Sequence, residues 1–161
     1  MRILVRNKTK RWLNTLPKRV SSSAMILENS IGQVLIVKSG YKPYWTFPGG
    51  IIDPRETPKE AAIRETLEEV GIIIESTKVE FVAVVDRRSD FADTYQFIFK
   101  APLVLGGLDK IVLQQSEIEE YLLVTREQVR SGNLPYGKVI SHWASGRSGY
   151  IEQTFGEKRH A

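Results

Sequence analysis

The chain contains no cysteine, so it can form no disulfide bond and offers no thiolate as a nucleophile or metal ligand. Histidine is scarce: His142 and His160 are the only two, too few for a histidine metal site or a Ser-His-Asp triad. Long apolar runs are also missing, because no segment approaches the ~20 apolar residues that a membrane span needs. We therefore expect a soluble, cytoplasmic protein without a membrane partner.

Acidic residues are absent from the first twenty positions, which carry seven basic side chains. The other 141 residues carry 16 basic and 19 acidic side chains, so the net charge of +4 arises from the N-terminus alone. We divide the chain into a basic arm, residues 1–19, and one domain, residues 20–161, which is long enough to bury a sizeable core. The acidic balance of the domain makes a nucleic-acid partner unlikely as its main ligand.

The basic arm has no clear helical period, although Trp12, Leu13 and Leu16 could form a short apolar stripe that ends at Pro17. One interpretation is an extension that packs Trp12 and Leu16 on the domain or on a second copy in a homodimer. A second is a basic strip that contacts a polyphosphate or an RNA backbone. A third is a membrane-surface contact or a cleaved targeting peptide.

Residues 57–71 carry the signals of a helix with both ends marked. Thr57 is a good N-cap, Glu60 completes a Thr-x-x-Glu capping box, and Gly71 supplies a left-handed stop. At 100° per residue, one side of this helix gathers the residues that should pack on a sheet. They are Ala62, Ile63, Thr66, Leu67 and Val70.

Glu65, Glu68 and Glu69 fall together on the opposite side of the same helix. Like charges at this spacing destabilise a helix by about 0.2–0.5 kcal/mol per pair. A divalent cation would turn the repulsion into ligation, and hard oxygen ligands suit Mg²⁺ or Mn²⁺. A solvated helix face is the plain alternative, but we expect no basic partner among these three acids.

Residues 50–72 resemble the Nudix box, Gly-x5-Glu-x7-Arg-Glu-U-x-Glu-Glu-x-Gly-U, in which U is a bulky aliphatic residue. The fixed positions are filled in register by Gly50, Glu56, Arg64, Glu65, Glu68, Glu69, Gly71 and Ile72. Thr66 is the one departure, since the pattern prefers an aliphatic residue there. Because Thr66 should face the sheet, we expect it to affect packing and leave the chemistry alone. Residues 45–49 and the overall length extend the resemblance.

The resemblance implies an α/β fold, a Nudix-type α/β/α sandwich with a mixed sheet between helices. It also implies a hydrolase, a Nudix pyrophosphohydrolase that cleaves a nucleoside diphosphate linked to another moiety by attack of water on phosphorus. Such chemistry needs a cation, Mg²⁺ or Mn²⁺, to neutralise phosphate oxygens and acidify the water. It also needs a carboxylate that takes the proton.

By the same resemblance, Glu68 and Glu69 are the principal metal ligands, and Glu65 is a ligand or the general base. Arg64 cannot act as a base and is expected to orient the catalytic carboxylates through a bidentate pair. Glu56 is expected to serve the structure or the outer metal shell.

Three further residues complete the expected metal site. Gly49 and Gly50 let the backbone approach a ligand closely, and the carbonyl of Gly50 matches a metal ligand common in the family. A distal acid often joins such sites, and Glu117 and Glu120 are the candidates. Phosphate contact or base stacking is open to four loop residues, each equally plausible as a solvated side chain: Lys42, Tyr44, Arg87 and Arg88.

The pattern of the remaining chain predicts a sheet and two further helices. Helices are expected over 125–129 and 136–144, a polar loop over 86–90 and a turn over 105–109, whereas 147–161 is weakly patterned. The expected strands, of which the first two form an antiparallel hairpin, are 21–27, 33–37, 45–47, a strand beginning at 72–74, 79–85, 94–100 and 120–124.

The substrate class is narrowed by signatures that this chain lacks. ADP-ribose hydrolases of the family tend to carry a proline beyond the box, where this chain has Asp-Arg-Arg at 86–88. The Ser-Gln-Pro-Trp motif of NADH hydrolases and the coenzyme A signature are also missing. A (deoxy)nucleoside triphosphate, cleaved to a nucleoside monophosphate and pyrophosphate, is therefore the leading class. Alternatives are dinucleoside polyphosphates, nucleotide sugars, RNA 5′ ends, and a non-catalytic nucleotide-binding module.

Overall fold

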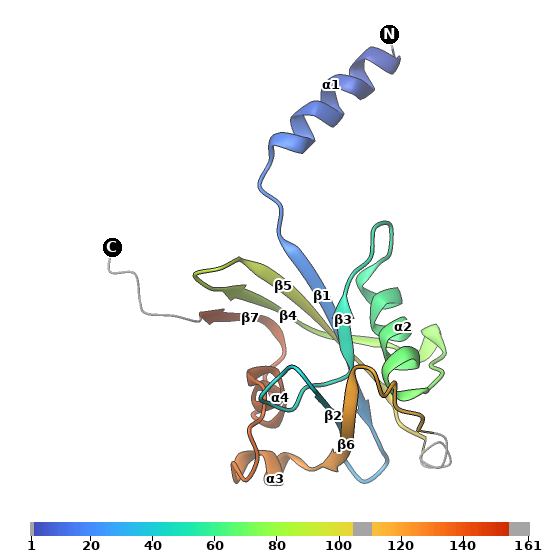
Figure 1. The fold of residues 1–161 in the computed structure, drawn as a ribbon, viewed down its shortest axis with the longest axis vertical. Helices are drawn as coiled ribbons and strands as arrows, with labels where there is room; N and C mark the ends of the chain where they lie inside the picture. Colours follow the sequence, from blue (N-terminus) through green and yellow to red (C-terminus); the bar gives the residue numbers. More distant parts are fainter. Residues whose placement is uncertain (1, 105–110, 155–161) are drawn as a thin grey trace.

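Seven strands form one mixed sheet in the order β6-β2-β1-β5-β4-β7, and β3 pairs with β1 (Figure 1). This computed structural model describes residues 2–104 and 111–154, and the side chains of α1 from residue 7 onward. The strands are β1 Val20–Glu28, β2 Val34–Ser39, β3 Gly49–Ile51, β4 Glu80–Arg88, β5 Thr94–Pro102, β6 Ile118–Val124 and β7 Gly149–Thr154. The helices are α1 Arg2–Thr15, α2 Pro58–Val70, the short 3₁₀ helix η1 Ser76–Lys78, α3 Arg126–Arg130 and α4 Lys138–Ala144.

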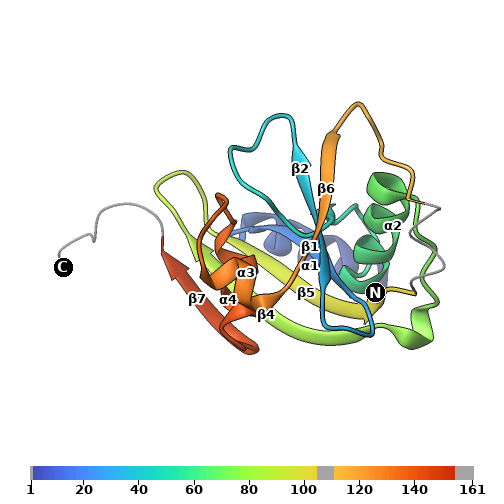
Figure 2. The same cartoon turned by 90° about the horizontal axis from the view of Figure 1, so that it is seen from below.

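Both faces of the sheet are covered, because alternate residues of its central strands point to opposite sides. In β1, Ala24 and Ile26 belong to the cluster that includes residues of α3 and α4. Their neighbours Met25 and Leu27 belong to the cluster that includes residues of α2. The layers are thus helix, sheet and helix (Figure 2), which confirms the expected α/β/α sandwich.

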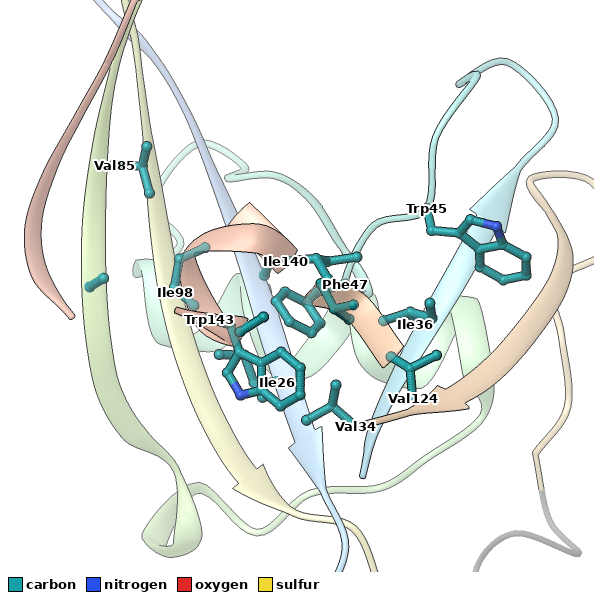
Figure 3. Packing of buried hydrophobic residues seen from close by; sticks show 14 of the residues in the cluster. Ile26, Val34, Ile36, Trp45, Phe47, Val85, Ile98, Val124, Ile140 and Trp143 are labelled. Carbon is teal, nitrogen blue, oxygen red and sulfur yellow. The ribbon is translucent and has the colours of Figure 1, made fainter. Parts of the chain in front are cut away.

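The cluster on the α4 face is built around aromatic side chains. Phe47 and Trp143 meet edge to face, with ring centroids 6.1 Å apart. Figure 3 shows these two rings beside Ile140 of α4 and above Ile26 of the sheet. Because Phe47 directly precedes the Pro-Gly-Gly segment, this packing anchors the chain just before it enters the site described below.

Strand pairing confirms the expected hairpin and adds a parallel register at the centre of the sheet. β1 and β2 are antiparallel, with Glu28 opposite Val34. β1 and β5 run parallel, which brings Ser22 beside Gln96. The sheet is therefore mixed, as the resemblance implied.

Expectations about the segment before α2 are wrong in detail. Residues 45–47 form only isolated bridges, one between Val37 and Thr46 and one between Trp45 and Tyr136. The Gly-Gly segment, expected to be a loop, is instead part of β3, which pairs antiparallel with β1. A Cβ at Gly49 would overlap the carbonyl oxygen of Ser23, so this pairing depends on the missing side chain.

Three expectations after α2 are also wrong. Residues 72–74 form no strand, since Ile72 and Ile74 pack on the α2-side cluster without joining the sheet. Asp86 to Arg88, expected in a polar loop, extend β4, where β7 pairs with all three residues and β5 pairs with the first two. The weakly patterned tail contains β7, which pairs parallel with β4. The turn expected over 105–109 lies outside the described residues.

The basic arm contains α1, a helix that the sequence did not predict and that projects away from the sheet (Figure 1). Trp12 is 60% exposed and Leu16 is 38% exposed, so packing of these side chains on the domain is not observed. None of the described helices is long and apolar enough to cross a membrane. Packing of the stripe on a second copy and the boundary at residue 19 stay predictions.

Arg19 is the residue of the arm that contacts the sheet. Its Nη1 donates to Oδ1 of Asp86 at 2.9 Å, and its guanidinium lies 4.7 Å from the ring centroid of Tyr95. Asp86 is buried, and the hydroxyl of Tyr150 with the nearby guanidinium groups holds its pKa below the ordinary value. We therefore expect Arg19 to contribute to the stability of the sheet, whereas α1 should contribute little.

Deleting residues 1–16 should change Tm by less than about 2 °C, because α1 is solvent-exposed and surface changes usually stay within ~0.5 kcal/mol. Deleting residues 1–19 should lower Tm further, because Asp86 then loses Arg19. The measurement is a circular-dichroism melt of both truncations beside Arg19→Ala, which should reproduce the additional loss. Equal melting temperatures for the two truncations would contradict the stabilising role of Arg19.

Candidate functional site

α2 is fixed at both ends by the caps that its sequence predicts. Glu60 N–H donates to the Thr57 hydroxyl and Thr57 N–H donates to the Glu60 carboxylate, which completes the capping box. Gly71 adopts the left-handed conformation, with φ of 70°, and its N–H donates to Leu67. Residues 112 and 114 donate N–H groups to the carbonyls of Val70 and Glu69 and so satisfy the last turn.

The face that α2 buries differs from the expected one. Thr66 is fully buried, as expected, and its hydroxyl donates to the carbonyl of Ala62 at 2.7 Å. Leu67, expected on the packing face, is 48% exposed, and Glu69, expected on the outer face, is only 4% exposed. The contact face is therefore rotated towards Glu69, because the β3 backbone offers that carboxylate a hydrogen bond.

That hydrogen bond joins α2 to β3. Gly49 N–H donates to Oε2 of Glu69 at 2.8 Å. A Cβ on Gly50 would overlap Oε1 of Glu65, so the second glycine also permits a close approach. The two glycines of the Pro-Gly-Gly segment thus place the β3 backbone directly against two of the predicted catalytic carboxylates.

Arg64 contacts the acids of the box, as its expected orienting role requires, so the expectation that Glu65, Glu68 and Glu69 have no basic partner is wrong for Glu65 and Glu68. Its Nε and Nη2 form a bidentate pair with Glu56, at 2.8 and 2.9 Å. Its Nη1 donates to Glu65 at 2.8 Å and to Glu68 at 3.0 Å. The bidentate partner is therefore Glu56, which is anchored in turn by Asp53 N–H, and single bonds orient the other two acids.

The carboxylates of the box differ in their protonation equilibria. Burial raises the pKa of Glu65, although the adjacent Arg64 opposes the shift. Burial raises the pKa of Glu69 to about 7, against the opposing effect of the Gly49 N–H donor. By contrast, the Arg64 hydrogen bonds lower the pKa of Glu56. Glu69 is therefore a buried acid whose negative charge is only partly compensated, by the Gly49 N–H and the charge of Lys42.

The two candidates for the distal acid lie in different surroundings. The negative charge of Glu117 is one of the effects that raise the pKa of both Glu65 and Glu69, so Glu117 lies near the box. Glu120 lies in β6 opposite Lys38 of β2. These placements favour Glu117 over Glu120 as the additional member of the site.

The donor chemistry of the site fits a hard divalent cation, since it combines carboxylates with the nearby β3 backbone. Within residues 2–104 and 111–154, however, no three His, Asp or Glu side chains are arranged so that they could hold a metal ion as they stand. Arg64 engages Glu65 and Glu68, and the Gly49 N–H engages Glu69. Glu68 has a half-exposed side chain, so it is free to rotate away from Arg64 towards a cation.

A cavity of about 410 Å³ adjoins the box on the α4 face of the sheet. Its lining includes Gly49, so the cavity and the carboxylate site meet at that residue. The described lining residues include three bases and no acid: Lys42, Arg87 and Lys138 are the bases. The cavity is therefore suited to an anionic ligand with an apolar or aromatic portion.

Sequence reasoning located only part of this cavity. Lys42, Tyr44 and Arg87 were candidate ligand contacts, and all three line it. Arg87, however, comes from β4 and not from a loop, while Gln153 comes from the undetected β7. β7 carries little local signal, because Ile151 is its only aliphatic residue and no apolar–polar alternation marks the strand.

Comparison with known proteins identifies relatives over a part of the sequence and over most of the fold. A model of the NUDIX domain matches residues 17–143. A putative 8-oxo-dGTP diphosphatase of Bacillus subtilis is 49% identical over 47 residues, which span 29% of this chain and 32% of that protein. An RNA pyrophosphohydrolase of Stutzerimonas stutzeri is 46% identical over 55 residues, 34% of this chain and 35% of that protein. The chain thus matches about a third of the length of these curated relatives.

Solved structures share the fold over a much larger part of the chain. A MutT protein from Methanosarcina mazei has a TM-score of 0.66 and 21% identity, covering 82% of this chain and 95% of that one. A NUDIX hydrolase from Nitrosomonas europaea has a TM-score of 0.63 and 20% identity, covering 88% and 81%. Since the domain match extends over most of the sheet and contains all of α2, this chain belongs to the Nudix family.

Proposed function

We propose that this chain is a metal-dependent pyrophosphohydrolase acting on a nucleoside diphosphate linked to another moiety. The leading substrate is a (deoxy)nucleoside triphosphate, which yields a nucleoside monophosphate and pyrophosphate. The observation that carries the proposal is the junction at Gly49, whose N–H holds the buried carboxylate of Glu69 and which also lines a cavity with basic side chains. Substrate phosphates beside carboxylates require positive charge between them, and Nudix hydrolases generally use divalent metal ions.

Mg²⁺ or Mn²⁺ suits the proposed ligands, which are Glu68, Glu69, the carbonyl of Gly50 and, as the distal acid, Glu117. Bound there, the cation would supply charge neutralisation for phosphate oxygens and a more acidic water. Glu65 then accepts the proton of the attacking water, since its raised pKa makes it a better base than an ordinary carboxylate.

Arg64 has a positioning role in this proposal. Its bidentate contact with Glu56 fixes the guanidinium plane, and the remaining nitrogen holds Glu65 in place. When Glu68 turns towards a cation, Arg64 keeps two of its three carboxylate partners. Glu65, the proposed general base, therefore stays oriented while Glu68, a proposed metal ligand, moves.

RNA 5′ ends are a second candidate substrate, because several relatives that match about a third of this chain are RNA pyrophosphohydrolases. The basic arm would supply contacts to the RNA backbone, and its exposed lysines and arginine on α1 are available for them. Trp12 is the sole aromatic residue of the arm, which offers little base stacking. Free nucleotides therefore remain the preferred substrates.

Glu69→Gln should stabilise the metal-free protein at pH 8 by about 1–3 kcal/mol, because it removes a carboxylate whose burial opposes ionisation. As pH rises from 4.5 to about 7, the unfolded chain loses this proton before the folded chain does, so the wild-type penalty grows over that window. The gain should therefore be full above pH 7 and nearly absent at pH 4. Melts in EDTA at both pH values provide the measurement.

Added Mg²⁺ should raise the Tm of the wild-type protein more than that of Glu69→Gln, because the variant lacks a charged ligand. Thr66→Val is the matched control on the same helix, and its response to Mg²⁺ should equal that of the wild type. An unchanged Mg²⁺ response in Glu69→Gln, or a lower metal-free Tm at pH 8, would remove Glu69 from the site.

Mg²⁺- or Mn²⁺-dependent release of a nucleoside monophosphate is expected from a panel of nucleoside triphosphates, nucleotide sugars and dinucleoside polyphosphates. Glu65→Gln should lower kcat by about 10²-fold or more, the usual contribution of a general base. Thr66→Val should retain nearly full kcat, since its side chain faces the core. Chromatographic identification of both products is the measurement. Nucleotide binding without turnover on the whole panel would establish a binding module instead.

Deleting residues 1–16 should leave kcat on small nucleotides within roughly an order of magnitude, about 1.4 kcal/mol. RNA binding is compared before and after deletion at two salt concentrations. A backbone contact made by the arm would give a log–log salt slope near about −0.7 per phosphate on a single strand. Tight, salt-dependent RNA binding that vanishes on truncation would instead favour the RNA 5′-end substrate.

A further inference from the structure

The second half of α1 has an apolar stripe that is open to solvent. Trp12 and Leu16 lie one helical turn apart, and at 100° per residue Leu13 falls on the same side of the helix. Leu16 continues the last turn, since its N–H donates to the carbonyl of Leu13 at 3.4 Å. All three side chains are exposed, Trp12 and Leu13 by half or more of their surface. The stripe is therefore an apolar surface that the domain leaves uncovered.

Basic residues flank this stripe on both sides. On a helical projection, Lys8 lies about 40° from Trp12 at one border, and Lys10 lies about 60° from Leu13 at the other. Both lysines are exposed. The first twenty residues contain seven basic and no acidic side chains, so no acid of the arm neutralises this charge. α1 thus combines an apolar side with a strong positive charge.

Further apolar side chains are exposed at the end of the sheet from which the arm emerges. Val20 begins β1, Ile51 ends β3 and Phe91 lies in the turn between β4 and β5. All three are more than half exposed, and Phe91 is 99% exposed. Register pairing places Val20 beside Thr94 and Ile51 beside Ser22, so the three residues share one end of the sheet (Figure 1). A partner that covers α1 can also reach this end.

This end of the sheet carries acids beside its apolar residues. Asp90 and Asp93 lie next to Phe91 in the same turn, and Arg19 donates to Asp93 at 3.5 Å. Attraction to a negatively charged partner must therefore come from α1 and its neighbouring bases.

Three classes of partner differ in how much of α1 they would satisfy. An RNA backbone would pair with the lysines and arginines but leave Leu13 and Leu16 in water, and Trp12 alone stacks few bases. A second copy that pairs through α1 would bring two acid-free basic helices together, which like-charge repulsion opposes. An anionic bilayer satisfies both sides of the helix, because its headgroups attract lysine while its acyl boundary accepts tryptophan and leucine.

The lysines at the borders of the stripe suit this last partner. Their long apolar stems let the ammonium groups of Lys8 and Lys10 reach the headgroups while the stripe between them is buried. Tryptophan is enriched at the membrane–water interface, where its ring is partly apolar and its N–H finds a polar partner. Basic residues beside an exposed Trp and two Leu are thus the side-chain pattern of a helix that lies on a membrane surface.

We propose that α1 binds the surface of an anionic lipid bilayer, with Trp12, Leu13 and Leu16 at the acyl boundary and Lys8 and Lys10 at the lipid headgroups. None of the described helices can cross a membrane, so the contact is confined to the surface. The expectation of no membrane partner followed from the lack of spanning segments, which a surface helix does not need. This inference does not depend on the proposed hydrolase activity.

Vesicles of equimolar phosphatidylserine and phosphatidylcholine test the proposal with the full chain. Their addition should shift the tryptophan emission to shorter wavelength, because Trp12 leaves water, whereas Trp45 and Trp143 are already buried. Trp12→Phe should abolish the shift and retain most of the binding. Vesicles of phosphatidylcholine alone should bind at least about tenfold more weakly, because they lack the negative surface potential.

Co-sedimentation with the mixed vesicles measures the contribution of each side of α1. Lys8→Gln and Lys10→Gln should each lower the partition coefficient about fivefold, the usual effect of one basic residue near an anionic surface. Trp12→Ala should lower it about tenfold or more, because its ring is the largest apolar group of the stripe. Two controls should bind like the wild type: Asn14→Ala, on the opposite side of α1, and Lys78→Gln, an exposed lysine of η1.

Thermal melts should show each α1 variant within about 2 °C of the wild-type Tm, because the exposed helix contributes little to stability. Absence of binding to the mixed vesicles, or equal binding to phosphatidylcholine alone, would overturn the proposal. Single-stranded RNA binding that needs Lys8 and Lys10 but not Trp12, without vesicle binding, would assign the arm to RNA instead. A dimer that Trp12→Ala dissociates in size-exclusion chromatography, again without vesicle binding, would assign the stripe to a second copy.

Discussion

The approach of the Gly49–Gly50 backbone to α2 is the constraint on which the site depends. A side chain at either position would collide, with the carbonyl of Ser23 in one case and the carboxylate of Glu65 in the other. Their absence lets β3 pair with β1 and lets Gly49 N–H hold Glu69. A shift of β3 by one residue would move the Gly49 N–H away from the carboxylate of Glu69, which is buried. The fold thus buries the negative charge of Glu69 at a free-energy cost, and a bound cation would offset that cost.

On the exposed side of α2, Arg64 also stabilises the negative charges of the box carboxylates. Its guanidinium donates four hydrogen bonds to Glu56, Glu65 and Glu68 and one to the carbonyl of Ile51, so the mutual repulsion of the box acids is partly offset without a metal. The bond to Glu68 is the most dispensable of these, because that side chain is half exposed and ion pairs at the surface contribute little. In the proposed metal site, Glu68 would therefore turn towards a cation at low cost, whereas Glu65 and Glu56 would keep their bonds to Arg64.

The elements that could be predicted from the sequence are those with local signals. The caps of α2, the first hairpin and the alternation in β5 depend on nearby residues and were correct. The long-range pairings were not: β7 has few apolar residues and is stabilised by β4, and β3 is a strand because β1 lies beside it. Likewise, the box residues were found through their fixed spacing. The face of Glu69 depends on a contact twenty positions away, and the place of Gln153 in the cavity lining depends on the pairing of β7 with β4, so neither carries a local pattern.

The cavity and the box carboxylates lie on opposite faces of the sheet, and this separation follows from strand geometry. Side chains alternate between faces, so a strand such as β4 cannot present adjacent residues to the same ligand. Ala83, Val85 and Arg87 share the α4 face, and only the last of them, near the end of the strand, is charged. The charged side chain of β4 therefore lies where its apolar side chains on this face end. The carboxylates of the box lie on α2, on the opposite face of the sheet. The two sides meet at Gly49, which lines the cavity and whose N–H also holds Glu69.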